Sequence, residues 1–411
     1  MKILHTSDWH LGKRLGDFSR IEEKKEVLAE IGRIAETEQV DLVLISGDLF
    51  DTWNPPVEAI ELLYRTLSQL SDGGKRPVVA IAGNHDSPER IEAPDVLARE
   101  KAIFFSGFPH THIQPSDALS TAFISHSGPG FITLTLPHTK ETVSLLLTPY
   151  ASEQRMKTCL GSENPEEVLR KTLSAHWEKS LGAMNPSAEI IVLVSHLYII
   201  DQKGERPEEP LDEEKPILSP GGISEVHTEN LPEGIQYAAL GHLHRRQVIA
   251  THPCPVVYSG SPLSYSFSEA SQIKSVEIAE AEPGKPVQHR QVFLKSGFPL
   301  IRKRFETAED AFAWLPHHPD CYLEITLKTE TFLSPETERE LHKLHPRIVN
   351  LIPEIVPEGD DSPEYTAIPD PAADIENLFA GYFRKSRAGA SPDSEMMNLF
   401  REILATEEES I

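Results

Sequence analysis

LHTSDWHLG, residues 4–12, lies near the start of the chain and places an acid and an imidazole two residues apart, Asp8 and His10. The stretch begins as a short apolar strand, and on an extended backbone residues i and i+2 point to the same side. Both side chains could therefore reach one metal ion where the strand ends. By the same alternation Ser7 and Trp9 are expected to point away from the metal and to serve the structure. An isolated Asp-x-His pattern is common by chance, so a site depends on ligands from the rest of the chain.

Length and composition limit the kind of protein this can be. A chain of 411 residues predicts two or three domains. Its formal charge of −25 is the opposite of that of a simple nucleic-acid-binding protein, so metal ions or a partner would have to supply positive charge to a polyanionic substrate. The three cysteines are widely spaced, and neither a signal peptide nor a membrane-spanning run is recognisable. These features predict a soluble cytoplasmic protein without a membrane association.

The first ninety residues predict a strand–helix–strand–helix–strand order. After the opening strand come a helix over 21–35, a buried strand over 40–46, a helix over 56–70 and a buried strand over 77–82. This order is typical of a right-handed α/β arrangement. In open α/β sheets sites lie beyond the carboxyl ends of the strands, so the polar clusters that follow these strands should converge.

The middle of the chain changes character. Residues 103–149 hold short segments separated by Gly, Pro and Ser, which suggests a second, more antiparallel sheet packed on the first. A helix over 165–181 leads to a buried strand over 190–194, and residues 237–240 and 256–258 predict further short strands. Residues 201–235 are rich in Pro, Glu and Gly and are expected to form a long loop.

The last third predicts a separate module and a tail. Strand patterns over 322–327 and 348–355 flank a helix over 336–344, which indicates a small α+β module within residues 299–356. A linker rich in Pro and acidic residues follows. Two amphipathic helix patterns then begin near Ile375 and Met396.

Seven candidate metal ligands follow five predicted strands. They are Asp8, His10, Asp48, Asn84, His196, His242 and His244. Imidazole, carboxylate and amide ligands suit borderline divalent ions such as manganese, and also iron or zinc. The set is too large for one ion and fits two ions that share a carboxylate, which hydrolytic enzymes hold about 3.5–4 Å apart. His85 would then be free to donate a proton, while Asp51 and Asp86 could orient imidazoles from outside the ligand set.

Several of these residues also have a plainer interpretation. One histidine alone is more often a core or surface residue, Asn84 after Gly83 could be a turn residue, and Asp48 could cap a helix. The joint placement of all clusters after buried strands favours the metal site. In contrast, several histidines have no acidic companion after a strand and are expected to be surface features: His110, His112, His138, His227, His252, His317 and His318.

The clusters together resemble a known family. Asp8-x-His10, Gly47-Asp48, Gly83-Asn84-His85-Asp86, His196 and Gly241-His242-x-His244 match the five motifs of the calcineurin-like metallophosphoesterase superfamily. The wider segments HTSDWHLG (5–12), GDLFD (47–51), ALGHLHR (239–245) and GSP (260–262) with Ser266-Phe267 resemble the break-repair nuclease family, whose bacterial members are nuclease subunits of SbcCD complexes. The resemblance covers residues 1–285 motif by motif and the tail by architecture only.

The resemblance implies a domain organisation in the α/β class. It implies a four-layer metallophosphoesterase β-sandwich flanked by helices over 1–285 and a small α+β capping domain over 290–356. A linker over 357–374 would lead to a helical segment over 375–411 that binds the coiled-coil base of an SbcC-type ATPase.

The resemblance also implies roles for the candidate ligands. One ion would take Asp8, His10, Asp48 and His244, and the other would take Asp48, Asn84, His196 and His242, with His85 as the catalytic histidine and Mn²⁺ as the metal. Two departures stand out. The fourth motif reads Ser195-His196 where the family usually has Gly-His. Asp51 stands near the place of a histidine that some relatives carry, which puts any exonuclease role of that histidine in doubt here.

The predicted function is a Mn²⁺-dependent DNA nuclease. By resemblance it would be a double-strand exonuclease and single-strand or hairpin endonuclease that processes DNA ends in repair and recombination, as a homodimer within a heterotetramer with the ATPase. Residues 351–411 hold 14 acidic and 4 basic residues, a net charge of −10, so much of the negative charge lies away from the catalytic half. A stand-alone phosphodiesterase acting on a nucleotide or other small substrate has the same site chemistry and is the alternative. A metal-binding scaffold without catalysis is a third class, which the complete ligand set argues against.

Overall fold

The computed structural model divides the chain into two units, residues 1–301 and 302–411, and each is described by itself. It describes residues 1–115, 124–157, 164–184, 190–202, 204, 207, 225–329, 333–355, 376, 378–380, 383, 391–394 and 396–401. The linker 357–374, most of the loop 201–235 and most of the segment 375–411 lie outside these residues. Among the described helices, none has the length and apolar character needed to span a membrane.

The first sheet has six strands in the order β17-β16-β1-β4-β5-β6. They are β1 (Lys2–Thr6), β4 (Leu42–Ile45), β5 (Val78–Ile81), β6 (Ile103–Ser106), β16 (Ser275–Glu280) and β17 (Gln288–Phe293). β1, β4, β5 and β6 are parallel, which confirms the predicted α/β order, and β16 runs antiparallel to β1. β6 was expected in the second sheet but extends the first, and β17 lies beyond the predicted domain end at residue 285.

The second sheet has seven strands in the order β14-β15-β13-β10-β9-β8-β7. They are β7 (Ile124–Gly128), β8 (Phe131–Thr135), β9 (Thr142–Thr148), β10 (Ile190–Ser195), β13 (Tyr237–Leu240), β14 (Gln247–Ala250) and β15 (Val256–Tyr258). Only its two edges are antiparallel, since β9, β10, β13 and β15 are parallel. Within residues 103–149, the expectation of a second, more antiparallel sheet was therefore right for β7, β8 and the pairing of β8 with β9. Crossovers such as the helix between β9 and β10 return the chain in the same direction.

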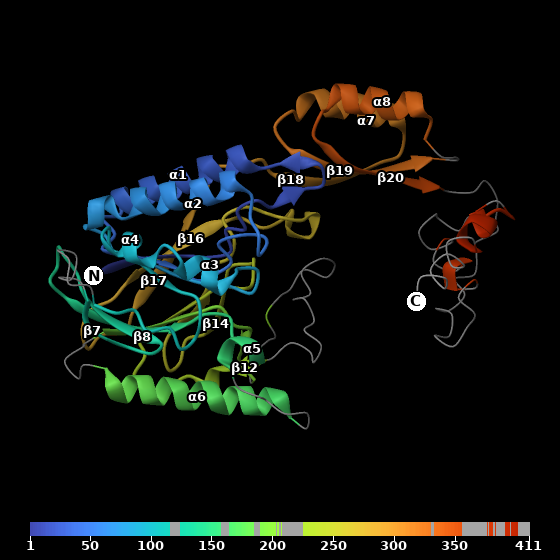
Figure 1. Ribbon diagram of the computed structural model, residues 1–411. Coiled ribbons are helices and arrows are strands. Elements are labelled where there is room, and N and C mark those ends of the chain that lie inside the picture. Colours follow the sequence, from blue (N-terminus) through green and yellow to red (C-terminus); the bar gives the residue numbers. More distant parts are fainter. Residues whose placement is uncertain are drawn as a thin grey trace. The chain divides into compact units, whose positions relative to one another are not determined.

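Helices cover the outer faces of the two sheets and complete four layers (Figure 1). α1 (Ile21–Thr37) and α2 (Val57–Leu70) lie on the first sheet, and α6 (Pro165–Ala183) lies on the second. Alternate residues of the central strands face opposite layers, so Leu4 packs toward α1 and α2 while Ile3 packs between the sheets. The four-layer sandwich predicted by resemblance is confirmed.

Shorter elements connect these layers. They are β2 (Arg14–Leu15), β3 (Phe18–Ser19), α3 (Pro88–Glu92), α4 (Asp95–Arg99), α5 (Glu153–Met156), β11 (Ile199–Ile200) and β12 (Val226–His227).

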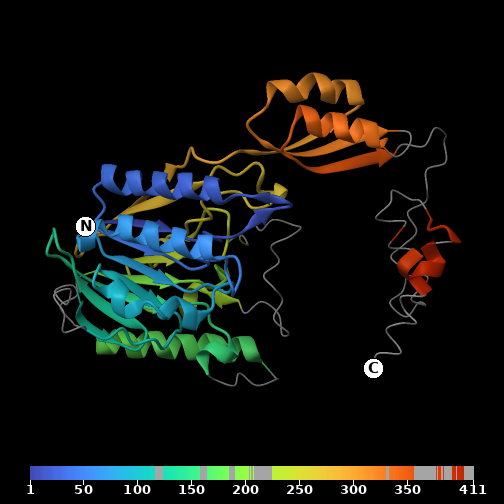
Figure 2. The same ribbon diagram turned by 45° about the horizontal axis from the view of Figure 1, so that its top comes forward.

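The second unit contains a three-stranded sheet with two helices on one face (Figure 2). Its elements are β18 (Leu300–Phe305), α7 (Ala308–Trp314), β19 (Tyr322–Thr329), α8 (Pro335–Leu344) and β20 (Ile348–Ile355). The hydroxyls of Thr307 and Ser334 cap α7 and α8 by accepting backbone N–H hydrogen bonds. The α+β character was predicted, whereas β18 and α7 were not.

The described part of the tail brings the two amphipathic patterns together. The rings of Phe379 and Phe400 stack with centroids 4.0 Å apart. Arg401 forms an ion pair with Glu376 at 2.7 Å. Among the described residues, this aromatic pair and this ion pair connect the two segments.

Candidate metal centre

The candidate ligands follow strands of both sheets. Asp8 and His10 follow β1, Asp48 follows β4, and Asn84 follows β5 of the first sheet. In the second sheet His196 follows β10, while His242 and His244 follow β13. The structure brings all of these side chains together at the carboxyl ends of the parallel strands, where sites of α/β sheets lie.

The backbone at the opening motif is left-handed rather than extended. Asp8 and His10 have φ values of 53° and 41°, and Asp48 has a φ of 50°. The alternation argument for Asp8 and His10 was therefore wrong, although both side chains do reach the site. Backbone hydrogen bonds from Asp8 N to Gly47 O and from His10 N to Asp48 O, both 3.0 Å, hold the two loops side by side.

Glycines permit the close approach of these loops. A Cβ atom on Gly47 would lie 2.2 Å from Nδ1 of His196, and one on Gly83 would lie 2.1 Å from Oδ1 of Asp48. These distances are far shorter than any tolerated contact. The glycines that precede Asp48 and Asn84 are therefore required by packing of the site itself.

The carboxylate of Asp48 lies between two groups of donors. Its Oδ2 is 3.5 Å from Nε2 of His10 and 3.3 Å from Nε2 of His196. Its Oδ1 accepts a hydrogen bond of 2.9 Å from the backbone N–H of His85. One oxygen is thus shared between the two groups, and the other is fixed by the backbone.

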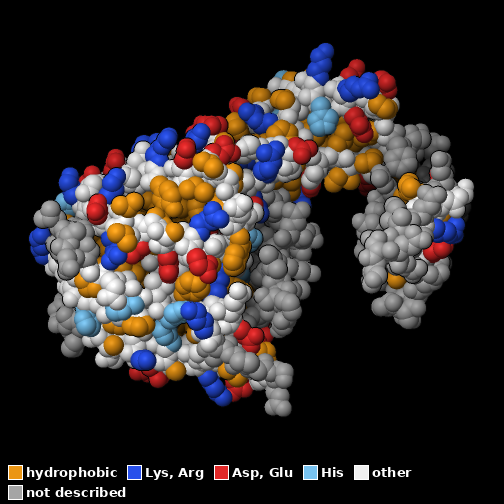
Figure 3. Space-filling model, viewed as in Figure 1, with side chains coloured by type: hydrophobic (Ala, Val, Ile, Leu, Met, Phe, Trp, Pro, Cys, Tyr) orange, Lys and Arg blue, Asp and Glu red, His pale blue; other side chains and the backbone are white. Residues whose placement is uncertain are grey.

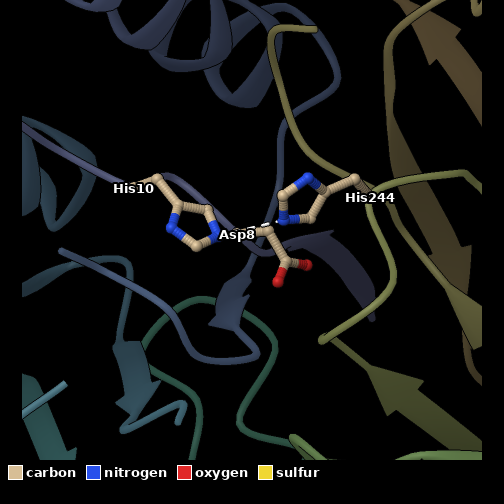
Figure 4. Close-up of side chains that lie close together, drawn as sticks. All are labelled: Asp8, His10 and His244. Atoms are coloured by element: carbon tan, nitrogen blue, oxygen red, sulfur yellow. Dashed lines mark hydrogen bonds between the residues drawn. The ribbon is translucent and has the colours of Figure 1, made fainter. Parts of the chain in front are cut away.

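The first group consists of Asp8, His10 and His244 (Figure 4). Nε2 of His10 lies 3.0 Å from Nε2 of His244, so the two rings aim their nitrogens at a common point. Burial lowers the pKa of His10 to about 3, which leaves its imidazole neutral and able to act as a ligand.

The second group gathers around Asn84. Its Oδ1 lies 3.0 Å from Nε2 of His196 and 3.1 Å from Nδ1 of His242. Burial lowers the pKa of His242 to about 3. Burial alone would also lower the pKa of His196, but the charge of Asp48 outweighs it and raises that pKa.

Outer contacts orient two of the imidazoles. Nδ1 of His196 donates to the carbonyl oxygen of Ser46 at 2.7 Å, and Nδ1 of His244 lies 3.3 Å from Oε1 of Glu269. In both rings Nε2 is left to face the centre, as metal-binding histidines require. This donor set of imidazoles, carboxylates and an amide fits two divalent ions that share Asp48.

The three other predicted site residues lie beside this centre. Oδ1 of Asp51 is 3.4 Å from Nδ1 of His10, where it can orient that ring. His85 is half-buried, and its Nδ1 donates to the carbonyl oxygen of Asp51 at 2.9 Å. The carboxylate of Asp86 contacts backbone instead of an imidazole, accepting from the N–H groups of Leu49, Phe50 and Gly83. It fixes two ligand loops to each other.

Sequence reasoning missed three residues at the site. Ser7 was expected to point away, but its hydroxyl donates to the carboxylate of Asp8 because the left-handed backbone breaks the alternation. Glu269 orients His244 and was not itself among the matched residues, although it lies two positions after Phe267. The buried guanidinium of Arg155 donates to the carbonyl oxygens of Gly83 and Asp86, both at 2.7 Å. Of these, Ser7 and Glu269 had a local signal, their positions next to Asp8 and near Phe267.

Comparison with known proteins agrees with this geometry. The model of the family described as calcineurin-like phosphoesterase matches residues 1–246. The D subunit of the SbcCD nuclease of Bacillus subtilis is 36% identical over 415 residues, covering 100% of this chain and 99% of the relative. The proteins of the same name from Staphylococcus epidermidis and Rhodobacter capsulatus are each 30% identical and cover 74% of this chain, with 75% and 71% of their own lengths matched. The chain belongs to the calcineurin-like phosphoesterases and, within them, to the family of SbcCD nuclease D subunits.

Proposed function

We propose that this chain is a Mn²⁺-dependent DNA nuclease that hydrolyses phosphodiester bonds with two metal ions. The observation that carries the proposal is the single oxygen of Asp48 that lies between His10 and His196. Donors for one ion would be Asp8, His10, Asp48 and His244, and donors for the other would be Asp48, Asn84, His196 and His242. Bound there, two divalent ions supply positive charge that stabilises the phosphate in the transition state and lowers the pKa of water.

The chain's own residues position the reaction. The hydrogen bond from Nδ1 of His85 to the Asp51 carbonyl fixes the ring and leaves Nε2 for proton transfer to the leaving oxygen. Asp86 and Arg155 hold the loop that carries Asn84 and His85, so that both side chains keep one geometry.

DNA ends and hairpins are the proposed substrates, with an SbcC-type ATPase as partner and a homodimer within a heterotetramer as the assembly. The names of the similar proteins support a nuclease that works as one subunit of an SbcCD complex. Acidic and basic side chains intermingle on the face shown in Figure 3, where the described residues form no continuous basic surface. With a formal charge of −25, affinity for DNA would depend on bound metal and on the partner.

The test compares two substrates. Linear duplex DNA of a few hundred base pairs, with Mn²⁺ and with or without the ATPase, is set against methyl p-nitrophenyl phosphate. We expect DNA cleavage that the ATPase accelerates on duplex ends. Hydrolysis of the small diester without cleavage of any DNA would instead support the stand-alone phosphodiesterase. A variant with Asp48→Asn serves as the control, because it removes the charge proposed to bridge the ions.

A further inference from the structure

An exposed tryptophan follows the second motif of the site. Trp53 is 51% exposed, in the segment between β4 and α2. Few aromatic side chains among the described residues of the first unit are comparably exposed, Phe293 at 55% being one. A single exposed apolar side chain is common on protein surfaces and carries no argument by itself, so what singles out Trp53 is its place beside the loops that carry the proposed ligands.

The position of Trp53 connects it to the metal centre. The guanidinium carbon of Arg155 lies 5.7 Å from the centre of the Trp53 ring and 5.3 Å from that of Tyr150. The ring of Tyr150 in turn lies 6.4 Å from that of the proposed ligand His242. A continuous series of His242, Tyr150, Arg155 and Trp53 therefore leads from the metal centre to solvent.

Arg155 gives this series a fixed geometry. Its guanidinium is almost fully buried and donates to Gly83 O and Asp86 O, on the loop that carries His85. The indole is therefore backed by a cation that cannot move away without breaking these bonds. The positive charge of Arg155 also attracts an anionic ligand that approaches the same place.

We propose that Trp53 is a stacking platform for an unpaired nucleobase next to the scissile phosphate. The inference rests on the proposed nuclease function and specifies the form of its substrate. Every nucleobase has a flat π face, and stacking on aromatic side chains is the general mode by which single strands are bound without sequence preference. A base within a duplex is already stacked on both sides, so the base bound by Trp53 must first leave the helix. The site thus takes single-stranded or frayed ends in preference to intact duplex.

The test is an affinity cycle that does not require cleavage. Two short single-stranded oligonucleotides are compared, one with bases and one with abasic residues throughout. Each is bound to the His85→Ala protein and to the double variant that also carries Trp53→Ala. Fluorescence anisotropy reports the affinity. We expect Trp53→Ala to weaken binding of the normal strand about tenfold to hundredfold, the range of one stacking contact. Removing the bases should weaken binding to the His85→Ala protein by a similar factor. In the protein that also carries Trp53→Ala, removing the bases should cause little further loss of affinity. Trp53→Phe should retain most of the affinity.

Phe293→Ala is the matched control, because it removes a comparably exposed ring from β17 and should leave affinity unchanged. The stacking proposal would be overturned if the affinity losses from Trp53→Ala and from base removal added fully. Equal affinity losses in Trp53→Ala and Phe293→Ala would also overturn it. Failure of the nuclease proposal has a separate signature, which is absence of DNA cleavage by the unmodified protein. Equal thermal unfolding midpoints in the variants show that the fold is intact.

Discussion

At the residue scale, the centre is built on backbone conformations that residues other than glycine rarely adopt. Asp8, His10, Asp48 and His242 all have positive φ values, between 41° and 103°. Each such residue costs on the order of 1 kcal/mol or more, which surrounding contacts must offset. The hydrogen bonds between the loops and the close glycine contacts supply that constraint. The site is thus held rigid before any ion binds.

Gly83→Ala tests this constraint. The added Cβ would lie 2.1 Å from Oδ1 and 2.3 Å from the backbone N of Asp48. We expect loss of Mn²⁺ binding in calorimetry and a fold less stable by about 1–3 kcal/mol, as for other overpacked sites.

Gly32→Ala is the matched control for this substitution. Gly32 lies within α1, and a Cβ there would meet nothing within 4 Å. This variant should be more stable by about 0.5–1 kcal/mol, since alanine is the better helix former. Equal Mn²⁺ binding by the Gly83 and Gly32 variants would contradict the packing argument.

His85→Ala separates catalysis from metal binding. The His85 side chain donates to the carbonyl oxygen of Asp51 and does not contact Oδ2 of Asp48. The variant should therefore keep its bound Mn²⁺, while the rate of DNA cleavage should fall about a hundredfold or more. Metal content by mass spectrometry and cleavage by gel assay give the two readouts. A further group that could hold a metal ion consists of His10, Asp51 and His85. Loss of one equivalent of metal from the His85→Ala variant would therefore show that His85 is a ligand.

The site residues differ in how visible they are in the sequence. The seven proposed ligands could be predicted because each follows a buried strand and belongs to a short motif. Glu269 and Arg155 could not, since they reach the site through contacts with residues 25 and about 70 positions away and are not themselves among the matched residues. Only the folded chain brings them there.

At the element scale, β16 joins the first sheet with a charged residue at its centre. Glu277 is fully buried and pairs across the sheet with His5. It accepts from Nε of Arg246 at 2.6 Å and from Nδ1 of His289 at 3.0 Å. Burial alone would raise the pKa of Glu277, but the hydrogen bonds from His289 and Arg246 lower it below its usual range.

The lowered pKa of Glu277 predicts a pH dependence of stability. A carboxyl whose pKa is lower in the folded state stabilises the fold above its unfolded pKa of 4.5, and this stabilisation is lost as pH falls through the folded value. Glu277→Gln should cost about 1–3 kcal/mol at pH 7, because it leaves the partly buried guanidinium of Arg246 incompletely paired. Urea unfolding between pH 3 and 7 should show the difference from the unmodified protein shrinking below pH 4.5.

Glu280→Gln provides the control on the same strand. Glu280 is half-exposed and lies 3.8 Å from Lys2, so its removal should leave stability nearly unchanged at every pH. A constant difference between Glu277→Gln and the unmodified protein across this pH range would refute the linkage to Glu277.

The elements themselves were predicted where hydrophobic periodicity is strong. Helices α1 and α2 and strands β4 and β5 lie close to their expected ranges. β6 was assigned to the wrong sheet because a short apolar run carries no information about its partner. The sequence of β17 has hardly any apolar alternation, and its residues are exposed or partly buried. It is a strand because it pairs with β16.

At the scale of the whole molecule, the negative charge is densest in the C-terminal segment of the chain. Residues 351–411 carry a net charge of −10 out of −25, whereas the proposed catalytic centre lies within residues 1–301. An acidic tail would repel DNA and can face a basic surface on a partner. The described tail residues also expose apolar side chains, with Met396 at 39% and Leu399 at 52%.

These features predict that residues 370–411 bind the ATPase and take no part in hydrolysis. Deletion of this segment should abolish capture of a purified SbcC-type ATPase, because the apolar face and the Phe379–Phe400 pair are removed together. Hydrolysis of methyl p-nitrophenyl phosphate by the truncated chain should continue at the rate of the full chain.

Two point variants refine the deletion. Leu399→Glu places a charge on the exposed apolar position of the tail and should weaken ATPase binding strongly. Leu97→Glu makes the same change at an exposed position in α4 of the first unit, 73% exposed, and should leave ATPase binding by the tail intact. Retention of the ATPase by the truncated chain would mean that the tail is not the binding segment. A loss of small-diester hydrolysis on truncation would show instead that the tail supports the catalytic unit directly.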